Sequence, residues 1–242
     1  MSYIFREHIK QSLAVIVFLI TLTACTSESY DAGDGPNSYL TADLVLLHTS
    51  QDKSVRSALL DDGTTLQFSN PFAQDWLTRP DSVYRALLYY DKTVAASDAA
   101  ASNPTATSIV RARSVRPVSV LRPVEAEDMK TLRTDPVGFE SLWMSKNKSY
   151  INLSLLLKSG KTEADDAMHA LGIVSHGTTT DADRRRTLHL TLYHDQGGVP
   201  AYYTVQQYVS IPTQLLEEAD TVELTLNTYN GKKVMKVAVS NL

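Results

Sequence analysis

Alternation of apolar and polar residues with a period of two is the feature that most constrains what this chain can fold into. It is clearest in three runs, 151–157, 188–192 and 222–226, where leucine, isoleucine or valine stands at every second position. Successive side chains of a β-strand point to opposite faces, so each run predicts a strand with one face on a core and one in water. The segment Tyr229-Asn230-Gly231-Lys232 predicts a tight hairpin turn after the last run. Several such strands over 139–242 predict an antiparallel β-sandwich.

A second set of short strands precedes this region. The run 55–60 ends at Asp61-Asp62-Gly63 and is followed at once by 64–68, which predicts a hairpin. Asn70 and Pro71 then have the form of a helix N-cap and first turn, which predicts a short helical insert. Five strands with an insert between the third and fourth match the order of an OB-like barrel.

These patterns predict an all-β chain, a small OB-like barrel followed by an antiparallel β-sandwich. The barrel is expected over 39–122 and the sandwich over 139–242. The charged segment 123–138 between them contains Pro136 and lacks period-two alternation, so we expect it to be a linker.

The first 24 residues have the composition of a lipoprotein signal peptide. Arg6 and Lys10 precede the apolar run 13–20, which is too short to span a bilayer. The run leads to Leu22-Thr23-Ala24-Cys25, which resembles a bacterial lipobox whose cysteine, the only one in the chain, is lipidated.

Acyl chains such as palmitate on Cys25 would anchor the protein to a membrane. The polar, acidic segment 25–38 is then expected to be a flexible tether. We therefore expect a lipoprotein of the cell envelope, held at the outer membrane.

Several short motifs, in order, resemble the NigD-like lipoproteins of Bacteroidetes. Tyr39–Leu47, Leu59–Leu66 and Arg85–Tyr90 resemble the family's N-terminal OB-like domain. A second set of motifs resembles the family's C-terminal β-sandwich domain: Asp135-Pro136, Trp143, Tyr150-Ile151-Asn152, Met168-His169, Leu190–His194 and Gly231-Lys232. The chain departs from the family pattern after His169, where Ala170-Leu171-Gly172 replaces Ile-Asn-Leu. The family's name implies an immunity or accessory role beside a bacteriocin.

No set of residues predicts catalysis or a bound cofactor. Four histidines lie within 26 residues, but their spacing matches no metal-ligand pattern, so no metal site is expected; they are His169, His176, His189 and His194. Cys25 is used by the anchor, and no nucleophile motif occurs elsewhere. The adjacent carboxylates Asp61-Asp62 are expected to point to water in a turn.

Aromatic residues are the remaining candidates for ligand binding. Tyr202, Tyr203 and Tyr208 form a candidate platform for a carbohydrate or peptide. Adjacent Tyr202 and Tyr203 are expected to face opposite ways, one into the core and one into solvent. Trp76 and Trp143 are expected in the cores. The formal net charge of −4 gives no reason to expect a nucleic-acid partner.

The sequence thus predicts a non-catalytic binding or assembly module of the cell envelope, with an envelope protein or glycan as partner. The alternatives are a bacteriocin-associated immunity or accessory factor and a surface glycan-capture accessory. A hydrolase is not expected.

Overall fold

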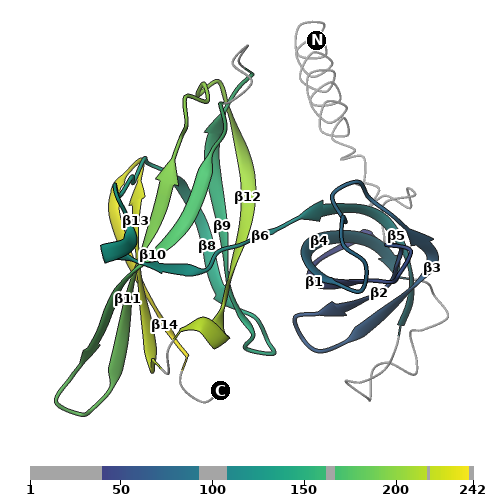
Figure 1. Ribbon diagram of the computed structural model, residues 1–242, viewed down its shortest axis with the longest axis horizontal. Helices are drawn as coiled ribbons and strands as arrows, with labels where there is room; N and C mark the ends of the chain where they lie inside the picture. The colour runs from purple at the N-terminus through teal and green to yellow at the C-terminus, as the bar shows by residue number, and fades with distance from the viewer. Residues whose placement is uncertain (1–39, 93–107, 162–166, 217–218, 240–242) are drawn as a thin grey trace, which may run out of the picture. The chain divides into compact units, whose positions relative to one another are not determined.

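The N-terminal domain is a closed barrel of five strands. The computed structural model describes residues 40–92, 108–161, 167–216 and 219–239. The barrel strands are β1 (Leu40–Thr49), β2 (Val55–Leu60), β3 (Thr65–Phe72), β4 (Val83–Lys92) and β5 (Ser108–Pro117). They close in the order β1-β2-β3-β5-β4, with β3 and β5 parallel (Figure 1). The OB-like barrel expected from the sequence is confirmed.

The prediction of a helical insert at Asn70 is wrong. β3 continues through Phe72, and no helix occurs between β3 and β4 in this described stretch. The side chain of Asn70 explains the difference. Its amide nitrogen donates to the Ala112 carbonyl at 3.2 Å, and its oxygen accepts from the Ala112 N–H at 3.1 Å. The residue thus extends the contact between β3 and β5, and Leu77 enters the barrel core from the following loop with 2% of its surface exposed.

The C-terminal domain contains two further sheets. The five-stranded sheet has the order β14-β13-β11-β10-β7, formed by β14 (Gly231–Ala238), β13 (Thr221–Thr228), β11 (Arg186–Asp195), β10 (Ala170–Thr180) and β7 (Pro123–Glu125). The four-stranded sheet has the order β6-β12-β9-β8, formed by β6 (Ser119–Val120), β12 (Tyr203–Pro212), β9 (Tyr150–Ser159) and β8 (Gly138–Met144). Two short 3-10 helices complete the described elements: η4 (Ala126–Asp128) and η5 (Thr213–Leu215).

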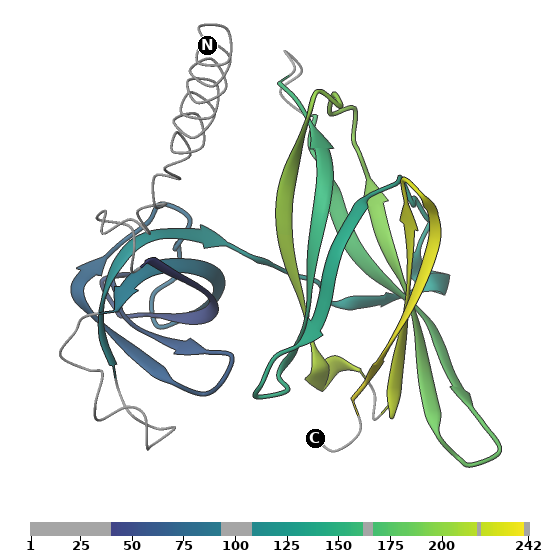
Figure 2. The same ribbon diagram turned by 180° about the vertical axis from the view of Figure 1, so that it is seen from behind.

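The two sheets pack as a β-sandwich, which confirms the second half of the predicted fold (Figure 2). The period-two runs supply the core, because every second residue of 151–157, 188–192 and 222–226, counted from the first, is buried. The sandwich is not purely antiparallel: the pairs β7–β10, β11–β13 and β6–β12 are parallel.

The segment 123–138, expected to be a linker, is part of the sandwich instead. β7 pairs with β10, and Thr134 forms a parallel bridge with His194. Val137 is completely buried in the sandwich core, and its N–H donates to the Asn227 carbonyl. The segment lacks period-two alternation because it joins the sheet through one short strand and isolated bridges, not because it is a free linker. The change from one domain to the other therefore occurs near Val118, between β5 and β6.

The signal peptide, the lipobox with Cys25, and the tether all lie outside the described residues. Among the described residues, no helix is long and apolar enough to cross a membrane.

Candidate functional site

The barrel and the sandwich are joined by a buried arginine. Arg85 lies on β4, and only 1% of its side chain is exposed. Its two terminal nitrogens donate to the two carboxylate oxygens of Asp61 at 2.6 and 2.7 Å. Asp61 follows β2 in the turn that the sequence predicted. This bidentate geometry gives a strong, directional ion pair.

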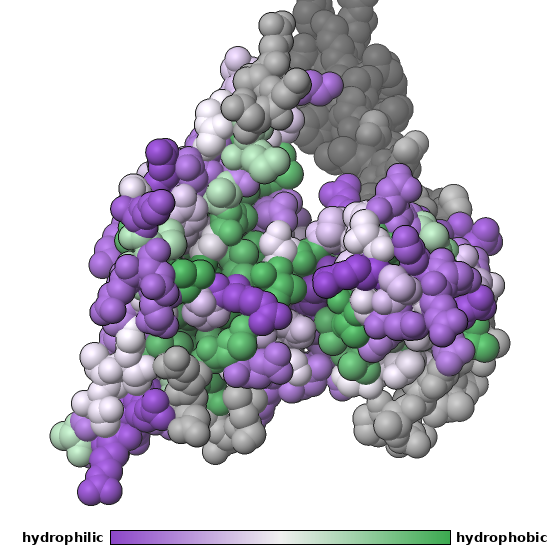
Figure 3. Space-filling view, in the orientation of Figure 1, coloured by the Kyte–Doolittle hydropathy of each residue, from purple (hydrophilic) through white to green (hydrophobic). Residues whose placement is uncertain are grey.

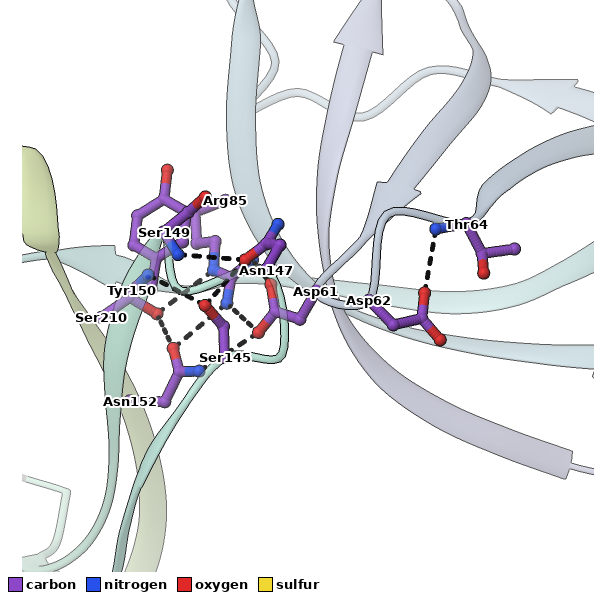
Figure 4. Close-up of polar contacts among 10 residues, drawn as sticks. All are labelled: Asp61, Asp62, Thr64, Arg85, Ser145, Asn147, Ser149, Tyr150, Asn152 and Ser210. Carbon is purple, nitrogen blue, oxygen red and sulfur yellow. Dashed lines mark hydrogen bonds and ion pairs between the residues drawn. The ribbon is translucent and has the colours of Figure 1, made fainter. Parts of the chain in front are cut away.

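The same guanidinium reaches two strands of the sandwich (Figure 4). Its Nε donates to Ser210 Oγ on β12 at 3.2 Å, and a terminal nitrogen donates to Asn152 Oδ1 on β9 at 3.1 Å. Asn152 Nδ2 donates to Asp61 Oδ2 at 3.1 Å, and Ser210 Oγ donates to Asn152 Oδ1 at 2.7 Å. We call Asp61, Arg85, Asn152 and Ser210 the Arg85 network.

In the Arg85 network, buried polar groups satisfy one another by hydrogen bonds. Asn152 and Ser210 are fully buried, although both point away from the sandwich core. The ring of Tyr150 lies 4.3 Å from the guanidinium carbon of Arg85 and covers one of its faces. Buried charges are tolerated only where partners satisfy them, so the network favours one arrangement of the two domains.

A polar turn between β8 and β9 adds to this contact. The N–H of Asn147 donates to the carbonyl of Asp61 at 2.7 Å. Inside the turn, Ser145 Oγ donates to Asn147 Oδ1 at 2.8 Å and accepts from the N–H of Tyr150 at 2.9 Å. The turn therefore has a fixed shape and places Lys146 beside the barrel.

Beside the network lies an apolar cluster. Leu44, Leu87 and Val118 are buried, and Tyr89, Trp143 and Tyr208 pack against them. The rings of Trp143 and Tyr208 meet edge to face, with centroids 6.3 Å apart. Trp143 thus packs between the domains and not in the sandwich core, where the sequence placed it.

A cleft of about 390 Å³ opens at this junction. We define it by the lining side chains that carry its chemistry: Asp43, Asp62, Tyr89, Trp143, Lys146 and Tyr208. With Asp61, which is paired with Arg85, three aromatic side chains, three carboxylates and one ammonium line one hollow. Such a set can bind a polar or charged group beside aromatic faces. In the space-filling view, apolar surface gathers on the sandwich face shown, broken by polar side chains (Figure 3).

One carboxylate of the cleft, Asp62, is held in its ionised form. Partial burial opposes ionisation of Asp62, but hydrogen bonds from Thr64 and the charge of Lys146 lower its pKa below 3.8. Asp43 accepts a hydrogen bond from the Tyr90 hydroxyl at 2.8 Å. Burial and the charge of Asp43 raise the pKa of Tyr90, so this phenol remains a donor.

The structure separates the three tyrosines of the predicted platform. Tyr208, in the middle of β12, lines the cleft, whereas Tyr203 begins that strand and Tyr202 precedes it. Tyr202 and Tyr203 are 78% and 50% exposed, so the expectation that one of them is in the core is wrong. The sandwich core does not cover this end of β12, where residues 203–206 are all exposed.

The four clustered histidines occupy separate sites, except for one pair. His169 Nδ1 and His194 Nε2 lie 3.0 Å apart in stacked rings. His194 Nδ1 lies 3.0 Å from the Asp135 carbonyl, which can only accept, so His194 donates there and accepts from His169. His189 contacts Glu223, and His176 contacts Thr191. Among the described residues, no three histidine, cysteine or acidic side chains converge as metal ligands.

Arg85, Asn152 and Ser210 were not predicted from the sequence as members of a joint site. One signal was present: Arg85 interrupts the otherwise apolar stretch 83–90 (VYRALLYY). A charged residue there requires a buried partner or solvent, but the sequence offers no means of finding partners 67 and 125 residues away.

Comparison with known proteins supports the fold assignment. Residues 120–239 match the family described as the NigD-like C-terminal beta sandwich domain. A search of curated proteins finds no relative.

Solved structures extend the likeness to both domains. A NigD-like immunity protein from Bacteroides caccae is 22% identical, with a TM-score of 0.59, and covers 81% of this chain and 91% of its own. A candidate toxin-related protein from Parabacteroides distasonis is 20% identical, with a TM-score of 0.53, over 82% and 92%. A candidate lipoprotein from Bacteroides fragilis is 14% identical, with a TM-score of 0.57, over 83% and 98%. At these identities, the likeness shows a shared fold.

Proposed function

Because its C-terminal domain places this chain in the NigD-like family, we propose that it is a non-catalytic binding module of the bacterial cell envelope. The observation that carries the proposal is the cleft beside the Arg85 network. There, aromatic and charged side chains from two domains converge on a hollow of about 390 Å³. A site beside buried hydrogen bonds that join its two domains is preorganised for binding, which reduces the entropic cost of capturing a partner.

The proposed anchor is a lipid on Cys25, within the lipobox Leu22-Thr23-Ala24-Cys25. The candidate lipoprotein of Bacteroides fragilis, which shares the fold, supports an envelope location. The lipobox and this shared fold are also the basis on which we propose the outer membrane as the location. An immunity or accessory role is the second candidate, favoured by the name of the Bacteroides caccae neighbour. Such a role would also be performed by binding.

The test combines membrane fractionation with site-specific crosslinking of the full chain in the producing bacterium. A photo-crosslinking residue replaces Lys146 at the cleft or, as the matched control, Lys236 on β14, whose side chain is 66% exposed. We expect a discrete crosslinked protein from position 146 and none from position 236. The wild type should fractionate with membranes, and Cys25→Ala should be left unprocessed or misrouted, because the residue that carries the lipid is gone.

Two outcomes would contradict the proposal. No adduct at position 146, or the same adducts at both positions, would exclude the cleft as a binding site. Full partitioning of Cys25→Ala with the membrane detergent phase after cleavage of its signal peptide would exclude the lipid anchor.

A further inference from the structure

The cleft has an unequal charge balance. Its lining contains Asp43, Asp61 and Asp62 but one basic residue, Lys146. The charge of Asp61 is balanced within the network by Arg85. Asp43 and Asp62 therefore outnumber Lys146, and both are hydrogen-bonded as carboxylates.

The surface beside the cleft adds a further carboxylate, that of Glu140. Ser154 stands opposite both Tyr208 and Ser141 in the four-stranded sheet, so it lies beside the cleft's tyrosine. Its hydroxyl donates to Glu140 Oε2 at 2.5 Å, and Gln206 also donates to that oxygen. These two hydrogen bonds lower the pKa of Glu140 below 4.5, and the bond from Ser154 has the larger effect. Glu140 is thus a fixed negative charge near the aromatic pair.

Aromatic faces and carboxylates together are the surroundings that a cation prefers. A ring attracts a cation placed over its face, and the effect grows when water is displaced. The molecule itself contains an example, because the Arg85 guanidinium lies over Tyr150 while Asp61 holds its nitrogens. In the cleft, Tyr89, Trp143 and Tyr208 are the aromatic side chains, and Asp43 and Asp62 are the carboxylates.

We infer that the cleft binds a cationic side chain, arginine or lysine, from a basic segment of the protein partner. This inference rests on the proposed function and specifies the chemistry of its site. Charge complementarity is the argument for this occupant. Lys146 lies near Asp62 from the opposite domain and acts as a competing internal cation, which an incoming side chain displaces.

The test measures binding of a hexa-arginine peptide to the full chain by Trp143 fluorescence. The chain has two tryptophans, so Trp76→Phe leaves Trp143 as the only reporter, and it lies in the cleft. In this background, Asp62→Asn should weaken binding by about threefold or more, because it removes a carboxylate partner. Asp183→Asn, which makes the same change in net charge on an exposed turn, should change binding by less than twofold.

Lys146→Gln gives an effect of opposite sign. Removing the competing cation should strengthen hexa-arginine binding by about threefold, whereas an anionic ligand would bind more weakly to this variant. Hexa-glutamate should produce no saturable signal. Hexa-arginine binding should fall as salt rises, because exposed charges are screened.

The results separate this inference from the proposed function. A partner crosslinked at position 146, with equal hexa-arginine affinity for Asp62→Asn and Asp183→Asn, would leave the binding role intact and overturn the cationic ligand. Weaker binding to Lys146→Gln would also overturn it. Absence of any partner at position 146 would reject the proposed function, whatever the peptide shows.

Discussion

At the scale of single residues, the Arg85 network contributes most to a defined structure. Arg85 is almost completely buried and uses four of its roughly five N–H donors on three partners. Removing one partner of a buried ion pair leaves the other charge without compensation, which is far more costly than losing a surface pair.

Arg85→Met should therefore lower the free energy of unfolding by about 3–5 kcal/mol. Chemical denaturation measures the change. The matched control is Arg113→Met on the neighbouring strand β5, because Arg113 also pairs with an aspartate, Asp91, but its side chain is 43% exposed. That variant should lose about 1 kcal/mol or less. Equal losses in the two variants would contradict the buried role of Arg85.

The histidine pair predicts a dependence of stability on pH. Burial and then the neighbouring His194 lower the pKa of His169 below its ordinary value of 6.5. The unfolded chain therefore takes up a proton at a higher pH than the folded chain. Stability should be greatest above pH 6.5 and fall as the pH drops toward the lowered pKa of His169.

Unfolding curves between pH 8 and about pH 5 test this prediction. His169→Asn keeps a donor toward His194 without a titrating ring, so it should flatten the decline. His176→Asn, at an exposed position of β10, serves as the control and should keep the decline of the wild type. An unchanged decline in His169→Asn would show that other groups cause it.

At the scale of elements, the segment 123–138 is the informative case. Its residues pair with β10 through a short strand and with β11 and β13 through one bridge each, and Val137 is enclosed in the core. This segment therefore belongs to the sandwich, and its removal would expose one edge of the five-stranded sheet.

Two alanine substitutions within this segment test whether it is a structural element or a linker. Val137→Ala should lower the free energy of unfolding by about 2 kcal/mol, because it opens a cavity in the core. Leu132→Ala should change it by about 0.5 kcal/mol or less, because that side chain is 43% exposed. If both substitutions proved neutral in denaturation, the linker interpretation would return.

At the scale of the whole molecule, the junction should couple the unfolding of the two domains. The Arg85 network and the cluster of Leu44, Leu87 and Val118 connect them through buried groups. In a Trp143→Phe background, Trp76 reports the barrel, while circular dichroism reports all strands. The two urea transitions should coincide, as expected for one cooperative unit.

Arg85→Met in the same background should separate the two transitions. With the network broken, the smaller barrel should unfold at a lower urea concentration than the sandwich. Two transitions already present before this substitution would show that the domains unfold independently and that the junction adds little coupling.

The amino-acid sequence by itself determined the local order of this protein. Period-two runs such as 188–192 and the turn at Asp61-Asp62-Gly63 predicted strands and hairpins, because side-chain alternation and glycine geometry are local properties. The motifs also predicted the NigD-like family and the sequence of barrel and sandwich.

Only the tertiary structure decided which polar residues meet. Asn70 bonds to β5 and does not begin a helix, and Asn152 lies buried beneath Arg85 instead of in water. In both cases the partner is more than forty residues away, so local propensity carries no information about it. The cleft arises in the same way, because Asp62 and Trp143 come from different domains and acquire a shared environment only when those domains pack.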